Sequence, residues 1–154
     1  MRIKNGFTLI ELLVVVSLIG VLATLVLANL NAARERGRDA QRKSDIRNIQ
    51  TALRLYYNDY GKYPTSSTNA EISGCGVVGT GVCTWGESEF SAAGSVYMNE
   101  LPSDPLPNVF YQYAYVDPDN YTLEACLENK SDEKGVDKPG ASWCPTNYVY
   151  EVKP

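Results

Sequence analysis

Residues 5–31 read NGFTLIELLVVVSLIGVLATLVLANLN, and this stretch decides the fold. Its apolar part covers residues 7–30 and contains one charged residue, Glu11. A helix of that length, at about 1.5 Å per residue, extends about 36 Å and can span a bilayer with some tilt. A charge inside hydrocarbon costs at least about 2.5 kcal/mol, so Glu11 requires a partner and indicates a functional role.

Residues 1–29 resemble the N-terminus of type IV prepilins and pseudopilins, with a short basic leader, Gly6, and then Phe7-Thr8-Leu9-Ile10-Glu11. The resemblance implies that a membrane peptidase cuts after Gly6 and that the new N-terminal Phe7 is N-methylated. It also implies that Glu11 neutralises the terminal amine of a neighbouring subunit during filament assembly. The implied partners are identical or related pilin subunits, a prepilin peptidase and an inner-membrane assembly platform.

A secretory signal peptide and a plain single-pass anchor also begin with basic residues and an apolar run. The run here is longer than the roughly 7 to 15 apolar residues of a signal peptide, and no A-x-A-like site follows it. An ordinary anchor has no reason to retain Glu11 one turn inside its membrane end. We therefore favour a filament subunit over a plain anchor.

Two signals disagree about orientation in the membrane. Six basic residues within 34–47 follow the span, and by the positive-inside rule they would place the C-terminal side in the cytoplasm. The cysteines also follow the span, are even in number and lack metal-site spacing, which favours an oxidising compartment. They are Cys75, Cys83, Cys126 and Cys144. We expect a cytoplasmic N-terminus, as the resemblance also implies, and pair the cysteines by proximity as 75 with 83 and 126 with 144, one of three connectivities.

The apolar span is predicted to continue as one helix of about 50 residues. Residues 32–60 contain no proline, are rich in helix formers, and repeat apolar side chains at helical spacing from Ile46 to Tyr60. Residues 7–30 would then form the membrane or filament-core half, and residues 31–60 an amphipathic half. Gly20 and Gly37 are either bend points or tolerated small residues.

Residues 61–154 are predicted to form a globular head. Gly61-Lys62-Tyr63-Pro64 ends the helix, since glycine suits the cap position and proline prevents continuation. A glycine-rich loop follows, and strands are predicted at 110–116, 121–127 and 147–152, the first two joined by a hairpin turn. We therefore expect an α+β pilin fold, with a small antiparallel sheet laid across the apolar helix face.

The segment Leu101-Pro102-Ser103-Asp104-Pro105 resembles the stretch that leads into the sheet of major pseudopilins. The match is partial, because Leu106-Pro107 stands where that family usually has tryptophan and glycine. This segment favours a secretion pseudopilus in the periplasm. Two expected disulfides and a glycine-rich loop instead fit an exposed extracellular pilus, so both interpretations stay open.

Other patterns give no clear ligand site. Gly74, Gly76 and Gly79 fit G-x-G-x-x-G, but with no strand or helix pattern around them they predict a loop. Some pseudopilins bind calcium in their C-terminal region, and the oxygen-bearing side chains here lack an ordered spacing, so a solvated acidic turn is favoured. The oxygen-bearing residues are Asn129, Ser131, Asp132, Glu133 and Asp137, with Ser131, Asp132 and Asp137 as the calcium candidates.

An enzymatic function is not expected. The chain has no histidine, no G-x-S-x-G motif and no cysteine expected to stay free, which leaves no acid/base or nucleophile set. Residues 61–154 carry 5 basic and 13 acidic side chains, a net charge of −8 that gives little affinity for nucleic acid. We predict a structural subunit of a type IV pilus or pilus-like filament without a cofactor. The alternatives are a type II secretion pseudopilin and a single-pass membrane-anchored ligand-binding module.

Overall fold

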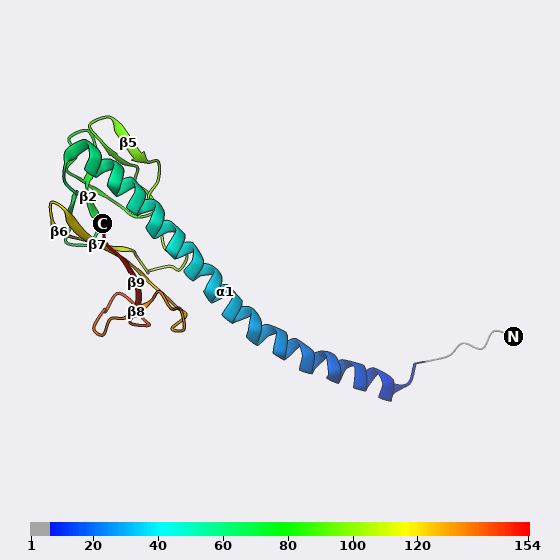
Figure 1. Cartoon of the computed structure of the whole chain (residues 1–154). Helices are drawn as coiled ribbons and strands as arrows, with labels where there is room; N and C mark the ends of the chain where they lie inside the picture. Colours follow the sequence, from blue (N-terminus) through cyan, green and yellow to red (C-terminus); the bar gives the residue numbers. More distant parts are fainter. Residues whose placement is uncertain (1–6) are drawn as a thin grey trace. The chain divides into compact units, whose positions relative to one another are not determined.

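The computed structural model describes residues 7–154, apart from the side chains of residues 25–29. The chain divides into two compact units, residues 1–36 and 37–154. The predicted leader, residues 1–6 with Gly6, lies outside the described residues. Figure 1 shows a long helix, α1, followed by a head built from short strands.

Helix α1 is one element, Leu9–Tyr60, of 52 residues. This confirms the predicted helix of about 50 residues, which follows from the absence of proline and the many good helix formers. Gly20 and Gly37 both lie within α1, and a Cβ added at either would meet no atom within 4 Å. Close packing therefore does not require glycine at either position.

Within the part of the chain that the structure describes, no helix is long and apolar enough to cross a membrane. The span predicted at residues 7–30 includes residues 25–29, whose side chains are outside that description. The membrane span stays a prediction.

The end of α1 is joined to the turn of a β-hairpin. Gly61 adopts φ +65° and donates its N–H to the carbonyl of Tyr57 at 2.7 Å, an αL cap of the kind that glycine permits. The N–H of Tyr63 then donates to the carbonyl of Pro118 at 2.8 Å. The Tyr57 hydroxyl donates to the Asp119 carboxylate at 2.6 Å. The helix end and the hairpin turn thus hold each other in place.

The hairpin belongs to a four-stranded antiparallel sheet, ordered β6-β7-β9-β8. Its strands are β6 (Gln112–Asp117), β7 (Asn120–Cys126), β8 (Val136–Asp137) and β9 (Tyr148–Val152). The three predicted strands correspond to β6, β7 and β9 within two residues at each end, and the predicted turn lies between β6 and β7. This confirms the α+β class.

Two further small sheets were not predicted. One has the order β1-β2-β3, with β1 (Thr65–Ser66), β2 (Ile72–Cys75) and β3 (Gly81–Cys83). The other pairs β4 (Phe90–Ala92) with β5 (Ser95–Met98). Strands of two to four residues in a Gly- and Ser-rich stretch give almost no alternating pattern, so sequence periodicity does not reveal them.

The head core lies between one face of α1 and the sheet. Ile46, Ile49 and Leu53 are fully buried at helical spacing, and they share one cluster with Tyr121 and Leu123 of β7. Alternate residues of a strand point to the same face, so β7 presents these side chains together. Full burial of each such side chain stabilises the fold by roughly 1.5–3 kcal/mol.

Candidate functional site

The start of α1 is a reciprocal cap made by Thr8 and Glu11. The Thr8 N–H and hydroxyl donate to Oε2 of Glu11 at 2.9 and 2.7 Å, and the Glu11 N–H donates to the Thr8 hydroxyl at 3.3 Å. This arrangement satisfies amides that a helix start otherwise leaves without partners. The carboxylate on which filament assembly is predicted to depend is therefore fixed at the helix start and exposed.

Phe7 precedes α1, and its side chain is 77% exposed. Gly6 lies outside the described residues, so the structure does not address the predicted cleavage between the two. The predicted N-methylation of Phe7 also stays a prediction.

Apolar side chains cover residues 7–22 of the first unit on all sides of the helix. Their exposed fractions range from 46% to 83%. A helix that is apolar all round requires burial in lipid or among other helices. The residues are Phe7, Leu9, Ile10, Leu12, Leu13, Val14, Val15, Val16, Leu18, Ile19, Val21 and Leu22.

A buried ion network centres on Arg42 in the head part of α1. Its guanidinium donates to both oxygens of Asp104 at 2.7 and 2.8 Å, and to Asp39 and Glu128 at 2.8 and 2.7 Å. Arg38 donates to both oxygens of Glu128 at 2.7 and 2.6 Å. The Arg42 side chain is only 1% exposed. This network links the helix to two loops that are distant in sequence.

The surroundings of the network fix its charge state. Burial opposes the charge on Arg42, but the bonds to Asp104, Glu128 and Asp39 outweigh it, so the pKa of the guanidinium is raised. The bonds from Arg38, with a smaller contribution from Arg42, lower the pKa of Glu128. The Arg42 guanidinium and the Glu128 carboxylate therefore favour their ionised forms in the geometry observed.

Sequence reasoning did not find this network. It treated Arg38 and Arg42 as members of a basic run after the membrane span, whereas the structure pairs both with acidic groups of the head. The Asp39–Arg42 pair has an i, i+3 spacing that could have been noticed. Asp104 and Glu128 lie 62 and 86 residues beyond Arg42, and no local pattern identifies them.

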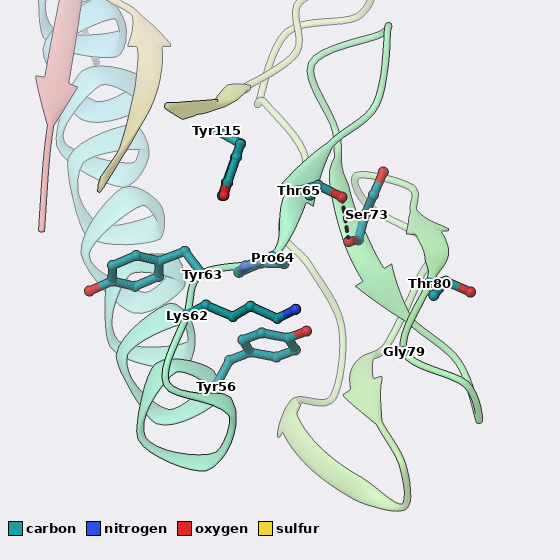
Figure 2. Close-up of a pocket in the computed structure, with 9 residues that line it drawn as sticks. All are labelled: Tyr56, Lys62, Tyr63, Pro64, Thr65, Ser73, Gly79, Thr80 and Tyr115. Carbon is teal, nitrogen blue, oxygen red and sulfur yellow. Dashed lines mark hydrogen bonds between the residues drawn. The ribbon is translucent and has the colours of Figure 1, made fainter. Parts of the chain in front are cut away.

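Figure 2 shows a pocket of about 230 Å³ between the end of α1 and the loop after β2. Its lining offers the Lys62 amine and several hydroxyl groups beside aromatic rings, and it contains no histidine, cysteine or carboxylate. This set can bind polar ligands but supplies no nucleophile with an adjacent general base. The lining residues are Tyr56, Lys62, Tyr63, Pro64, Thr65, Ser73, Gly79, Thr80 and Tyr115.

A disulfide between Cys75 and Cys83 closes the glycine-rich loop. The expectation that no strand precedes the G-x-G-x-x-G pattern was wrong, since β2 ends at Cys75. A strand, β3, follows rather than a helix, so no helix N-terminus is available for a phosphate. The tip of this loop presents Val77 and Val78, which are 90% and 82% exposed.

A second disulfide joins Cys126 to Cys144 and closes the loop between β7 and β9. Both pairs are those that proximity predicts. Of the calcium candidates, Asp137 lies exposed in β8, Ser131 is exposed in the loop, and Asp132 bonds to Lys43. Among the described residues, no three or more His, Cys, Asp or Glu side chains are placed to hold a metal ion. Calcium binding by these residues stays a prediction.

Comparison with known proteins identifies one family motif and several relatives that extend over most of the chain. The family of the prokaryotic N-terminal methylation motif matches residues 1–27. Type II secretion system core protein G of Escherichia coli K12 is 31% identical over 141 residues, 91% of each chain. The protein of the same name from Vibrio cholerae is 30% identical over 142 residues, 92% of this chain and 90% of that one. The one from Pseudomonas aeruginosa is 33% identical over 112 residues, 73% of this chain and 74% of that one.

No solved structure shows a significant match to the chain. The two relatives of at least 30% identity that extend over nine-tenths of both chains decide the family. The predicted resemblance to prepilins and pseudopilins is confirmed, and the chain belongs to the family of type II secretion system core protein G.

Proposed function

We propose that this chain is a structural subunit of a pilus-like filament and acts by assembling with copies of itself or related subunits. The observation that supports this function is the apolar surface of residues 7–22, interrupted by the charge of Glu11. Burial of that surface among neighbouring helices supplies the driving force for assembly. Soluble monomeric proteins rarely expose a contiguous apolar surface of this size.

Assembly begins with insertion into the inner membrane, with the N-terminus in the cytoplasm. A prepilin peptidase cuts after Gly6, Phe7 is methylated, and an inner-membrane assembly platform receives the subunit. In the filament, the Glu11 carboxylate pairs with the Phe7 amine of a neighbour. The hydrogen bonds from Thr8 go to Oε2 of Glu11, so we assign Oε1 to this contact.

The filament is a secretion pseudopilus in the periplasm rather than an extracellular pilus. The three relatives support this choice, since each is named as a core protein of a type II secretion system. The partial match at residues 101–105 supports it as well. The subunit itself is structural and has no catalytic role.

A membrane-anchored ligand-binding module is the competing function. The pocket beside Lys62 is the feature on which it would depend. Such a module would need the N-terminal helix only as an anchor, so loss of filament formation would leave its function intact. Filament formation therefore separates the two.

The test expresses the chain in a bacterium whose type II secretion system lacks its own core protein G. We expect a mature chain that starts at Phe7, periplasmic filaments detected by cross-linking of neighbouring subunits in the cell, and restored secretion of a reporter. Gly6→Val should leave the leader attached and abolish filaments, because a larger residue does not fit the peptidase pocket, while Asn5→Ala serves as the matched control. A mature chain that starts elsewhere, or processed chains that never form filaments, would contradict the proposal.

A further inference from the structure

Three neighbouring residues of α1 hold the loop that follows β7 against the helix. Asp39 accepts the N–H groups of Glu128 and Asn129 at 3.0 and 2.8 Å. Arg38 and Arg42 both bind the Glu128 side chain. Residues four apart lie on the same helix face, so these contacts follow one edge of the helix. The next residue along this edge, one helical turn after Asp39, is Lys43.

Lys43 reaches the middle of the loop and donates to Oδ2 of Asp132. The two side chains are only 20% and 16% exposed, so solvent screens the pair less than it would an ion pair at the surface. The other carboxylate oxygen of Asp132 accepts the N–H of Lys134 at 3.0 Å. Each carboxylate oxygen of Asp132 thus accepts a hydrogen bond from the chain itself.

Backbone carbonyls of the loop also accept hydrogen bonds from side chains. The Tyr148 hydroxyl donates to the carbonyl of Asp132 at 2.6 Å. The Tyr148 ring lies so close to Gly135 that a Cβ there would be 2.1 Å from Cε1. At the base of the loop, the Thr146 hydroxyl donates to the carbonyl of Leu127 at 2.6 Å. The loop therefore closes around Asp132 with groups that the chain itself provides.

We propose that the Lys43 ammonium is the resident cation of this loop, so that the loop takes its folded form without calcium. An ammonium carries a positive charge and three donors, and it neutralises Asp132 while tying the loop to α1. Calcium would need six to eight oxygens, and here the Asp132 carboxylate and carbonyl both have other partners. This inference concerns the stability of the head and goes beyond the filament function.

The test measures thermal unfolding of the full-length chain in detergent by circular dichroism. It compares the unfolding temperature in excess calcium chloride with that in excess EDTA. We expect the same unfolding temperature for the unaltered chain in both solutions. Lys43→Gln should lower that temperature by roughly 4 °C or more in both solutions. Lys130→Gln, an exposed lysine of the same loop, is the matched control and should leave it unchanged.

Two results would overturn the proposal. The first is a higher unfolding temperature of the unaltered chain in calcium than in EDTA. The second is a Lys43→Gln variant that behaves like Lys130→Gln. If Lys43→Gln fails to fold, Lys43→Arg replaces it, because this variant keeps the charge and should fold. Calorimetric titration of the unaltered chain with calcium should give no saturable heat. A saturable calcium titration would also overturn the proposal.

Discussion

Arg42 in α1 and Asp104 in the loop before β6 form a buried two-bond ion pair, although 62 residues separate them in the sequence. The bonds are 2.7 and 2.8 Å long, and the two side chains are 1% and 0% exposed. Water can reach neither charge once the pair forms. Removal of Asp104 leaves the guanidinium its bonds to Asp39 and Glu128 but takes the partners from its Nε and Nη2 donors.

Asp104→Asn preserves the shape of the side chain and removes its charge. We expect the free energy of unfolding to fall by about 3 kcal/mol, because the asparagine amide offers one acceptor where the carboxylate offered two, and a buried N–H of Arg42 is left unsatisfied. Denaturant unfolding of the full-length chain in detergent measures the change. Glu100→Gln alters an exposed acid nearby and should change stability by no more than about 0.5 kcal/mol. Equal stabilities of the two variants would show that the buried pair contributes nothing.

The network also predicts a dependence of stability on pH. The pKa of Glu128 is lowered from its ordinary 4.5, first by the bonds from Arg38. The pKa of Asp132 is lowered from 3.8, first by the bond from Lys43. Carboxyls with lowered pKa values stabilise the fold above their ordinary values, and this stability is lost as the pH falls through their folded pKa values.

Glu128→Gln should therefore lose less stability than the unaltered chain between pH 7 and pH 3. Burial raises the pKa of Asp45 and of Glu124, so these groups act in the opposite sense, and only the comparison of variants isolates Glu128. Denaturant unfolding of each chain at pH 7 and at pH 3 gives the free energy of unfolding that each loses between the two pH values. Glu133→Gln in the same loop is the control. If Glu128→Gln loses as much stability between pH 7 and pH 3 as the unaltered chain, Glu128 does not contribute to destabilisation by acid.

Glu11→Ala tests the assembly mechanism. The variant makes the apolar segment more apolar, so membrane insertion should be unimpaired, while assembly should fail or drop sharply for want of the charge partner. Unfolding of the head should not change, because the hydrogen bonds of the Glu11 side chain are made to Thr8 at the helix start. Ser17→Ala, a polar residue of the same segment, is the control. Filaments of Glu11→Ala at the parental level would exclude neutralisation by Glu11.

The two disulfides should contribute different amounts to the free energy of unfolding. Their sequence separations are 8 and 18 residues, and loops of this size contribute about 2 to 3 kcal/mol each. Removal of the longer loop by Cys126→Ser with Cys144→Ser should cost about 0.7 kcal/mol more than Cys75→Ser with Cys83→Ser. Peptide mapping without reductant checks the pairing first. Free thiols, or a bridge from Cys83 to Cys126, would refute it.

Local signals in the sequence predicted most of the secondary structure. The spacing of Ile46, Ile49 and Leu53 identified the buried helix face, and Gly61 the end of the helix. Aromatic and β-branched residues identified three strands of the larger sheet. These features depend on neighbours within a few residues, so a single sequence contains the information.

The contacts that organise the head depend on residues far apart in the chain. The bond from Lys43 to Asp132 spans 89 residues, and the bonds from Arg42 to Asp104 and Glu128 span 62 and 86. Charged side chains in a sequence give no sign of whether they will face solvent or one another. The basic run after the apolar segment was therefore treated as a signal of orientation, while part of it is a set of partners for acidic loops.

The bond between Tyr63 and Pro118 restricts how the head can change length during evolution. One additional residue in the last turn of α1 would rotate the following chain by about 100° and advance it by about 1.5 Å. The Tyr63 amide would then miss Pro118, and the Tyr57 hydroxyl would point away from Asp119. Insertions and deletions are therefore excluded from this exposed junction, whereas the tip at Val77 and Val78 can accept them without disturbing the hairpin.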